Sequence, residues 1–455
     1  MSERVYFIFD LDGVLVEFKD LHKKAFIQAW NECVPSYPID DECHTRLLEA
    51  RSTRQKLDIL GTHFGIIYDR DHVSNRKQEI TSVLLQTATI YNRTVRALEW
   101  AHAQGISVAC CSNSIKSTVV TSLSKIVPLS YFSVILSNED ITQPKPNPEI
   151  YERAIELLGI PKESVLVFED SNVGKEAARS AGLRVIDIVD AMDVSPAFLS
   201  YVLTNRIRPP PRRCNVVIPM AGLGSRFQTA GYAVPKPFLP VFEKPMFEWV
   251  ISNIVPDDIR PYATIHIIVR EEHIDRFREL NVHGYQLHTV PCLTEGAACT
   301  VLTVKDAINN EDALVIANSD QYLDWNAHDF YRCMSHPDYD GVISSFYQPN
   351  PSDLRWSYAN TDSEGHVVAV EEKKFIGPIA TTGIYGWKRG ADFVHDAETM
   401  IAKNIRVNNE FYVCPVYNQS IERGAHIRTL HCERMWGLGV PDDYEYFLQN
   451  YKPKH

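Results

Sequence analysis

The stretch VYFIFDLDGVL, residues 5–15, decides the fold of the first half of this chain. An unbroken apolar and aromatic run leads directly into Asp10 and Asp12. Such a run predicts a strand buried on both faces, as in a parallel sheet covered by helices. The spacing of two places both carboxylates on the same side of that strand, aimed at one site beyond its end. Because two carboxylates at one site repel each other, we expect a bound Mg²⁺ to offset their charge.

Apolar runs with strand character recur further along the chain, and helical patterns separate them. The runs ISVACCS (106–112), SVLVFED (164–170) and LRVIDIV (183–189) are the expected later strands of the same sheet. Between the first two strands, about residues 21–85, the pattern is mainly helical, which predicts a helical insertion. This alternation is typical of α/β architecture.

Polar residues follow these strands. Glu169 and Asp170 close the SVLVFED run and offer further hard oxygen ligands. Ser112 and Asn113 follow another strand and are able to hydrogen-bond a phosphoryl group. Lys145, in the segment QPKPNPEIY, is a cation held between prolines. Taken singly, each piece also has a plain structural reading as a turn, a helix cap or a solvated lysine.

Together and in this order, the four motifs resemble those of the haloacid dehalogenase-like hydrolases over about residues 4–190. The resemblance implies that Asp10 is the nucleophile that forms an aspartyl-phosphate and that Asp12 is the general acid and base. It also implies that phosphate is held by Ser112, Asn113 and Lys145. The implied Mg²⁺ ligands are Asp10, Asp12, Glu169 and Asp170. The helical insertion resembles the small cap of the phosphoglycolate phosphatase and β-phosphoglucomutase branch, which covers the site and selects the substrate. Arg51 and Arg54 of that cap either reach a distal phosphate or belong to a solvated helix face.

A boundary follows at IRPPPRR (207–213), because three consecutive prolines continue neither a helix nor a central strand. We therefore expect a phosphatase-like domain over residues 1–190 with its cap at about 16–88, a linker over 191–213, and a second domain over 214–455. Strand-like runs TIHIIV, ALVIANSD and GVISSF predict another, mostly parallel sheet in the second domain. The expected fold is α/β with two Rossmann-like domains.

The second domain opens with NVVIPMAGLGSRF (215–227), a strand that runs into a glycine-rich loop. Gly222 and Gly224 would let backbone N–H groups approach phosphates closely. Arg226 and, further on, Lys236 in VPKPFLPV add the cations that the leaving end of a triphosphate needs. Asp320, at the end of ALVIANSD, is a candidate Mg²⁺ ligand.

This pattern resembles the sugar-phosphate nucleotidylyltransferases, or nucleoside-diphosphate-sugar pyrophosphorylases, over about residues 214–450, and especially the subgroup that accompanies capsule synthesis. The resemblance implies a GT-A-like mixed sheet and attack by an acceptor phosphate on the α-phosphorus of a nucleoside triphosphate, with release of pyrophosphate. Catalysis would depend mainly on positioning and charge stabilisation. The implied roles are nucleotide binding by Gly222, Gly224, Ser225, Glu295 and Gly296, catalysis by Arg226 and Lys236, Mg²⁺ binding by Asp320, and acceptor binding by Lys373, Gly383 and Glu410.

The chain departs from this family pattern near its end. Many members have a second metal-binding aspartate where this chain has Gly437, and Val440 replaces a threonine. Asp442 and Asp443 follow nearby. We therefore expect metal binding to depend on Asp320 and the substrate phosphates.

Two other classes fit the second domain less well. A dinucleotide-binding domain would carry an acidic residue at a fixed spacing after the glycines, which this sequence lacks. A glycosyltransferase would carry a D-x-D metal motif, and NSDQY has a single aspartate.

Composition narrows the partners. With 455 residues, a net charge of −12 and a pI near 5.7, the chain is not expected to bind nucleic acid or acidic membranes non-specifically. No apolar run reaches the length of a membrane span, and the start does not resemble a signal peptide. The ten cysteines form neither a CxxC pair nor a metal-like cluster, which favours a reduced, cytoplasmic protein.

The leading hypothesis is a bifunctional enzyme of activated sugar or polyol synthesis, with a nucleoside triphosphate and a sugar or polyol phosphate as its partners. In the alternatives, the first domain is a phosphomutase that supplies a sugar 1-phosphate, or a regulatory relic. Asp10 and Asp12 serve the phosphatase and the mutase alike. A homo-oligomer is left open.

Overall fold

A computed structural model describes residues 5–48, 53–88, 90–222, 224–279 and 284–452 of the chain. The chain divides into two compact units, residues 1–208 and 209–455. Each unit has its own sheet and its own core, so the expectation of two α/β domains is confirmed. Within the described ranges, no helix combines the length and the apolar character that crossing a membrane requires.

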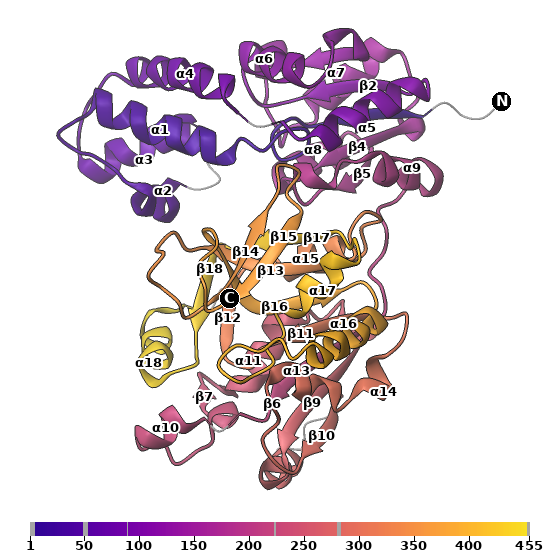
Figure 1. Cartoon of the computed structure of the whole chain (residues 1–455). Coiled ribbons are helices and arrows are strands. Elements are labelled where there is room, and N and C mark those ends of the chain that lie inside the picture. The colour runs from indigo at the N-terminus through magenta and orange to yellow at the C-terminus, as the bar shows by residue number, and fades with distance from the viewer. Residues whose placement is uncertain (1–4, 49–52, 89, 223, 280–283, 453–455) are drawn as a thin grey trace. The chain divides into compact units, whose positions relative to one another are not determined.

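The first unit is built on a five-stranded, fully parallel sheet (Figure 1). Its order is β3-β2-β1-β4-β5, with bounds β1 (Tyr6–Phe9), β2 (Ser107–Cys111), β3 (Phe132–Leu136), β4 (Val165–Glu169) and β5 (Arg184–Asp187). All three expected later strands are present as β2, β4 and β5. The strand β3 was not among the expected ones, because it lies at the sheet edge and only its two end residues are buried.

Helices cover both faces of this sheet. One core cluster joins its first face to α5 (Asn92–Ala103), α6 (Lys116–Ile126) and α9 (Pro196–Asn205), and another joins its second face to α7 (Glu149–Leu158) and α8 (Asn172–Ser180). The helix α9 falls within the stretch expected as a linker. Its Phe198, Leu199 and Val202 are fully buried in the first core, and this packing overrides the weak local pattern.

The expected helical insertion forms a separate lobe of the first unit (Figure 1). Its helices are α1 (Lys19–Cys33), α2 (Asp41–Leu48), α3 (Thr53–Phe64) and α4 (Arg70–Gln86). The lobe has its own small core around Trp30 and Phe26, independent of the sheet. We call this lobe the cap.

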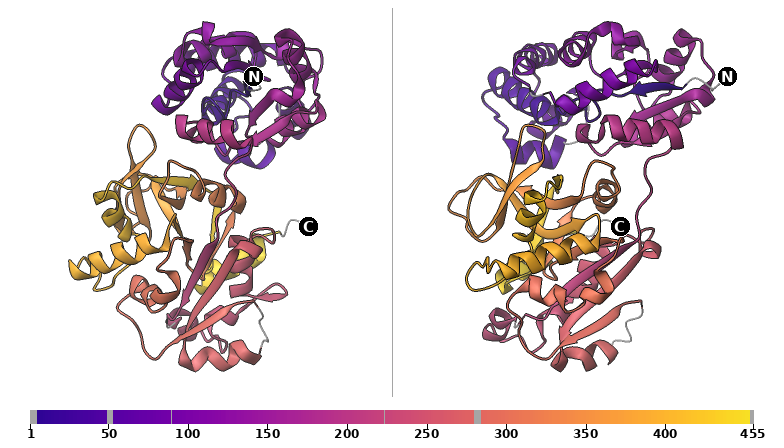
Figure 2. Two further views of the ribbon diagram at one scale, coloured as in Figure 1. Left: turned by 90° about the vertical axis from the view of Figure 1, so that its right-hand side faces the viewer. Right: turned by 45° about the vertical axis from the view of Figure 1, so that its right-hand side comes forward.

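The second unit contains a nine-stranded mixed sheet (Figure 2). Its main path runs β10 (Gln286–Val290), β9 (Ala263–Arg270), β6 (Cys214–Met220), β11 (Ala313–Ala317), β16 (Ile379–Trp387), β13 (Gly341–Tyr347) and β17 (Ile427–His431). The first four strands are parallel, whereas β16 runs antiparallel to both of its neighbours. The parallel half therefore matches the expectation from the sequence, and β16 makes the sheet mixed.

Shorter strands and helices complete this unit. The strands β14 (Ser357–Thr361) and β15 (Val367–Glu372) form a hairpin on β16, and the small pairs are β12 (Gln321–Asp324) with β18 (Arg434–Gly437) and β7 (Pro240–Val241) with β8 (Lys244–Pro245). The helices are α10 (Ser225–Thr229), α11 (Met246–Ile254), α12 (Ile274–Glu279), α13 (Ala297–Leu302), α14 (Lys305–Ile308), α15 (Ala327–Met334), α16 (Gly390–Ala402), α17 (Val416–Glu422) and α18 (Pro441–Asn450).

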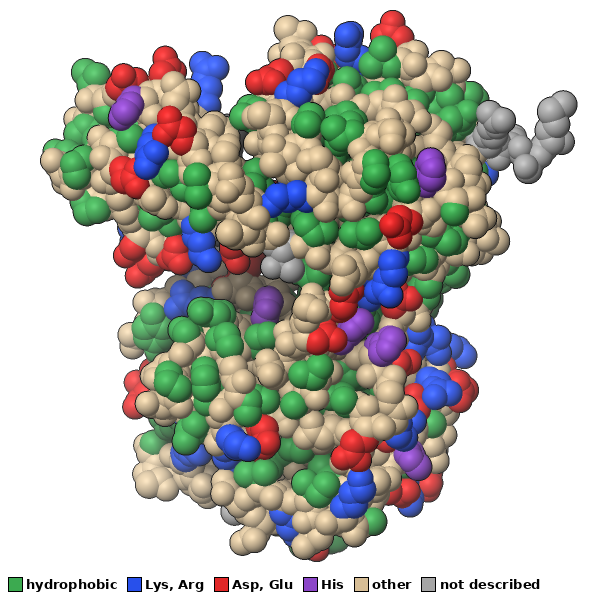
Figure 3. All heavy atoms as spheres, turned by 45° about the horizontal axis from the view of Figure 1, so that its top comes forward, with side chains coloured by type: hydrophobic (Ala, Val, Ile, Leu, Met, Phe, Trp, Pro, Cys, Tyr) green, Lys and Arg blue, Asp and Glu red, His purple; other side chains and the backbone are tan. Residues whose placement is uncertain are grey.

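Charged side chains of both signs are interspersed on the face of the molecule shown in Figure 3. This face carries no single basic field of the kind that nucleic acid requires.

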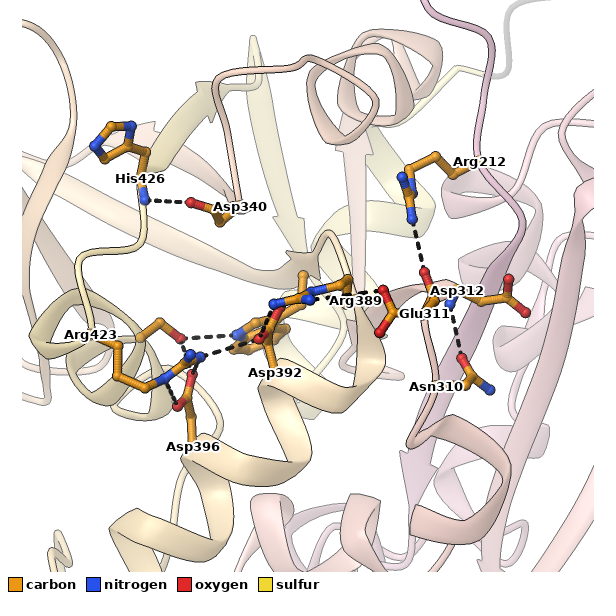
Figure 4. Close-up of polar contacts among 12 residues, drawn as sticks. Arg212, Asn310, Glu311, Asp312, Asp340, Arg389, Asp392, Asp396, Arg423 and His426 are labelled. Carbon is orange, nitrogen blue, oxygen red and sulfur yellow. Dashed lines mark hydrogen bonds and ion pairs between the residues drawn. The ribbon is translucent and has the colours of Figure 1, made fainter.

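A polar network closes one end of the second sheet and lines a cavity of about 140 Å³ (Figure 4). Asp396 is fully buried, and Arg423 donates to both of its carboxylate oxygens, at 2.7 and 2.9 Å. Arg389 makes the same two-point contact with Asp392, at 2.7 and 2.9 Å. Because each arginine is already held by a carboxylate, the network has the character of a structural brace.

Candidate functional site

The first candidate site lies at the carboxyl edge of the five-stranded sheet. Asp10 follows β1, Ser112 and Asn113 follow β2, and Glu169 ends β4. The chain leaves β1 toward β2 on one side and returns to β4 on the other, which opens a crevice beyond the strand ends. The fold thus brings the separate sequence motifs to one place.

Lys145 is the centre of this site. Its side chain is 3% exposed, and its Nζ donates to Asp10 Oδ1 at 2.7 Å, to Glu169 Oε1 at 2.5 Å and to the Cys111 carbonyl at 2.9 Å. Tyr151 donates its hydroxyl to the same Glu169 oxygen at 2.8 Å. Every donor of this buried ammonium therefore has an oxygen partner, as burial of a charge requires.

Ser112 and Asn113, expected to bind phosphate, have protein partners in this structure. Asn113 Oδ1 accepts the backbone N–H of Lys145 at 3.1 Å, and Ser112 Oγ accepts that of Ser114 at 3.1 Å. Asn113 thus positions the lysine loop. The expected phosphate clamp is assembled around Lys145, but phosphate contact itself stays a prediction for both residues.

Three carboxylates converge where Mg²⁺ is expected. One oxygen from each of Asp10, Glu169 and Asp170 lies within 4.8 Å of the others. Two glycines make room for them, because a Cβ on Gly13 would stand 2.3 Å from Asp170 Oδ2 and one on Gly174 would stand 1.8 Å from Glu169 Oε1. Three hard oxygen donors in a cradle that two side chains would fill fit a divalent cation. When bound, Mg²⁺ would offset the carboxylate charge and polarise a phosphoryl oxygen.

Asp12 does not belong to this group of three. Its Oδ1 accepts the backbone N–H of Phe18 at 2.8 Å. Burial, opposed by this hydrogen bond, raises the pKa of Asp12 to about 6. Burial, together with the charges of Glu169 and Asp170 and against the pull of Lys145, raises the pKa of Asp10 well above its ordinary value. Asp12 is thus poised to exchange a proton near neutral pH, and Asp10 needs a cation to stay ionised.

Two residues near Asp12 were not found from the sequence. His22 Nε2 lies 3.8 Å from Asp12 Oδ2, and Lys77 Nζ lies 3.5 Å from His22 Nδ1. Burial lowers the pKa of His22 to about 3 and that of Lys77 to about 8. Both come from cap helices, and nothing in their local sequence marks them. Arg54 is exposed on α3, and Arg51 lies outside the described residues.

The second candidate site is a cavity of about 260 Å³ in the second unit. Predicted residues among its lining are Gly222, Gly224, Lys236 and Asp320, and further lining residues include His273 and Asn318. Gly224 has a φ of +61°, which favours glycine at this turn before α10. Ser225 and Arg226 begin α10 but are not among the lining residues, and Arg226 is exposed.

A cation and an anion are in direct contact on the wall of this cavity. Lys236 Nζ lies 2.5 Å from Asp320 Oδ2. Asp320 is partly exposed, so a divalent cation could reach its carboxylate. Because Lys236 and Asp320 both line the opening, a triphosphate and its metal ion would meet both charges at once.

Protein backbone closely approaches Gly296. A Cβ there would stand 2.5 Å from the backbone N and O of Phe411, so the side-chain direction of this residue is closed. Phe411 N–H donates to the Glu295 carbonyl at 2.8 Å, and the Glu295 side chain pairs with Arg406 at 2.5 Å. Gly296 therefore lets the backbone at Phe411 come close, and nucleotide contact stays a prediction for Glu295 and Gly296.

The expected acceptor residues fall in two places. Lys373 Nζ donates to the Tyr412 hydroxyl at 2.6 Å, and a side-chain hydrogen bond joins Tyr412 to Glu410. Gly383 instead supports the cavity, because a Cβ there would stand 2.2 Å from Asn318 Nδ2. Lys373 and Glu410 are thus brought together, Gly383 lies against Asn318, and contact with an acceptor stays a prediction for all three.

Carboxylates lie beside Gly437, which ends β18, and beside Gly439, which follows that strand. A Cβ on Gly437 would stand 3.1 Å from Asp443 Oδ2, and one on Gly439 would stand 3.1 Å from Asp320 Oδ2. Asp443 thus places its carboxylate next to the position where an aspartate side chain at 437 would begin.

Comparison with known proteins gives a different family match for each unit. Residues 7–188 match the family model for haloacid dehalogenase-like hydrolase, and residues 215–414 match that for nucleotidyl transferase. Over 206 residues the chain is 29% identical to a phosphorylated carbohydrates phosphatase of Thermotoga maritima, covering 44% of this chain and 93% of that protein. It is also 29% identical to a β-phosphoglucomutase of Mycobacterium bovis over 207 residues, covering 39% of this chain and 78% of that protein. Among solved structures, the chain is similar to a nucleoside-diphosphate-sugar pyrophosphorylase from Vibrio cholerae, with 25% sequence identity and a TM-score of 0.44. The match covers 52% of this chain and 100% of that protein's chain.

Proposed function

We propose that this protein is a bifunctional enzyme of activated sugar or polyol synthesis. The proposal is supported by the match of one unit to haloacid dehalogenase-like hydrolases and of the other to nucleotidyl transferases. The first unit hydrolyses a phosphate ester with Mg²⁺, and the second transfers a nucleoside monophosphate to a sugar or polyol phosphate. The observation that carries the proposal is that each unit holds its own charged site, around Lys145 in one and between Lys236 and Asp320 in the other.

In the first unit, a carboxylate oxygen of Asp10 attacks the phosphorus and the bond to the leaving oxygen breaks. Asp12 donates the proton that the leaving oxygen takes up. A water molecule then attacks the phosphorus of the aspartyl-phosphate, and Asp12 accepts its proton. The bond between phosphorus and the Asp10 oxygen breaks, so inorganic phosphate is released and Asp10 is regenerated. Lys145 offsets the negative charge of the phosphoryl group throughout. The pKa of Asp12, about 6, suits both proton transfers.

In the second unit, an oxygen of the acceptor phosphate attacks the α-phosphorus, and the bond to the pyrophosphate oxygen breaks. The backbone around Gly222 and Gly224 and the charge of Lys236 hold the leaving phosphates. Asp320 would bind the Mg²⁺ that accompanies the triphosphate. Lys373 holds the acceptor phosphate, and Glu410 binds a hydroxyl of the acceptor.

A phosphomutase is the second candidate for the first unit, and the likeness to β-phosphoglucomutases supports it. The two activities use the same Asp10 and Asp12. The product separates them, because a mutase returns a phosphorylated sugar and a phosphatase releases inorganic phosphate. We further infer that the product of the second unit serves surface-polysaccharide synthesis. We also infer that the protein acts in the cytoplasm, because all ten cysteines are free.

The proposal is tested by phosphorus NMR on the full-length protein with Mg²⁺, each nucleoside triphosphate and a panel of sugar and polyol phosphates. We expect pyrophosphate together with a new diphosphate diester for one triphosphate and acceptor. We also expect inorganic phosphate from one phosphorylated metabolite. If neither set of signals appears across the panel, the proposed activities are wrong.

A further inference from the structure

His273 lies on the wall of the cavity in the second unit, and no motif of the sequence assigns it a role. It ends the short turn η7 (Glu271–His273), which directly follows β9. The strands β9 and β6 are parallel neighbours, so this turn and the loop with Gly222 and Gly224 leave the sheet at the same edge. His273 and both glycines line the cavity. The fold therefore places His273 beside the loop that is proposed to hold the leaving phosphates.

Two contacts fix the position of the His273 ring. It packs edge-to-face against Phe238, with the ring centroids 6.4 Å apart. Phe238 lies two residues after Lys236, which lines the same cavity. On its other side, Arg270 places its Nη2 3.2 Å from His273 Nε2, and the same Nη2 lies 2.6 Å from Glu272 Oε1. The imidazole is therefore held next to the segment that carries Lys236.

The contact with Arg270 determines which ring nitrogen of His273 carries the proton. Because arginine has donors and no acceptor, Nε2 of His273 accepts this hydrogen bond, and a neutral ring then carries its proton on Nδ1. Burial and the charge of Arg270 lower the pKa of His273, so the ring is neutral at pH 7. The side chain is 15% exposed, and Nδ1 has no hydrogen-bond partner among the described residues. The Nδ1–H group is therefore free to donate to a ligand.

We propose that His273 donates its Nδ1–H to an oxygen of the β- or γ-phosphate, the part of the triphosphate that leaves as pyrophosphate. The packing against the Lys236 segment selects this end of the nucleotide, because the charge of Lys236 holds the leaving phosphates. Phosphate oxygens accept hydrogen bonds strongly, and a neutral donor serves them without adding charge beside Lys236. Arg270 is a positioning residue, since it acts through the ring of His273. This inference rests on the proposed nucleotidyl transfer.

The test measures binding by calorimetry to the full-length Asp10→Asn protein with Mg²⁺, in which the first unit does not consume the probes. The probes are CTP, GTP, UTP and dTTP, the four corresponding nucleoside monophosphates, and inorganic pyrophosphate, which needs no knowledge of the base. We expect His273→Phe, which keeps an aromatic ring against Phe238, to bind the preferred triphosphate and pyrophosphate about tenfold more weakly. Binding of the corresponding monophosphate should change less than twofold, because it lacks the leaving phosphates.

Two further substitutions at this position separate the hydrogen bond from packing. The amide nitrogen of His273→Asn stands where Nδ1 stands in histidine, so this variant should keep triphosphate affinity within threefold. The amide of His273→Gln reaches the place of Nε2 instead and should lose about tenfold. His395→Phe is the matched control, because His395 is exposed on α16 and is not among the residues that line the cavity. It should leave all affinities unchanged.

The role of Arg270 is tested by combining substitutions. Arg270→Met should weaken triphosphate binding about threefold when His273 is present and have no effect when it is added to His273→Phe. An equal loss on both backgrounds would contradict the positioning role of Arg270.

Unchanged triphosphate affinity in His273→Phe, or an equal loss for triphosphate and monophosphate, overturns the inference. The proposed nucleotidyl transfer is checked separately, by pyrophosphate formation in the full-length wild-type protein. If no triphosphate gives pyrophosphate there, the transfer assignment fails, whereas the calorimetric comparison still reports on His273.

Discussion

Replacing Gly174 by alanine tests whether the carboxylate geometry of the first site matters. Gly174 lies in the first turn of α8 with an ordinary helical conformation. Helix propensity alone predicts that alanine stabilises this position by up to about 1 kcal/mol. The structure predicts the opposite, because the new Cβ would stand 1.8 Å from Glu169 Oε1 and 2.3 Å from its Oε2.

The magnitude follows from what Glu169 holds. To reach an ordinary carbon–oxygen contact, the carboxylate must retreat by about 1.5 Å. That movement breaks its 2.5 Å contact with Lys145 and its 2.8 Å hydrogen bond from Tyr151. A hydrogen bond to a charged group contributes about 1.5–3 kcal/mol, and partial relaxation leaves an expected loss of about 2–4 kcal/mol. Since Lys145 also contacts Asp10, the loss of its contact with Glu169 should shift Lys145 and Asp10. A shift of these side chains by about 1 Å should lower kcat at the first site about 100-fold.

The assay is urea unfolding of the first unit together with phosphate release by the full-length protein. Gly61→Ala on α3 is the matched control, because its Cβ would stand 3.3 Å from the Tyr68 ring edge and 3.6 Å from the Ile66 carbonyl oxygen, with no carboxylate nearby among the contacts within 4 Å. We expect that control to keep both stability and activity. A Gly174→Ala protein that is as stable as the wild type and within twofold of its activity would refute the reasoning.

Three further predictions concern other parts of the chain. Burial lowers the pKa of His266 to about 4. Because the unfolded chain binds this proton near pH 6.5, the stability that neutral His266 contributes is complete above that pH and falls by up to about 3 kcal/mol as the pH drops toward 4. Urea unfolding of His266→Gln should therefore show a correspondingly smaller loss of stability over this range than the wild type. Arg423→Met leaves the fully buried Asp396 without its cation and should destabilise the second unit by about 3 kcal/mol. The KM for the triphosphate should stay unchanged, and an altered KM would contradict the role of Arg423 as a structural brace. Lys236→Met should lower pyrophosphate formation at least 100-fold and leave phosphate release intact, as measured by phosphorus NMR. Equal loss of both signals would contradict separate sites.

The strand ends of the first unit could be predicted because local signals coincide there. The run before Asp10 and the run before Glu169 are apolar enough to be central strands, and parallel strands present their carboxyl ends together. Lys145 could be predicted only as a member of a motif set. Its three contacts depend on a loop whose position the local sequence does not specify.

The contact between His22 and Lys77 and the backbone pairing at Gly296 could not be predicted. His22 and Lys77 come from different helices, and only tertiary packing brings them together. Gly296 packs against the backbone of residue 411, which is more than a hundred positions away in the sequence. A glycine signals a close approach and does not reveal what approaches.

The most direct test of the central claim, two separate active sites on one chain, is to compare Asp10→Asn and Asp320→Asn with the wild type by phosphorus NMR. Asp10→Asn should lose phosphate release and still form pyrophosphate and diester, and Asp320→Asn should show the reverse. Loss of both activities in either protein, or of neither in both, would contradict the account.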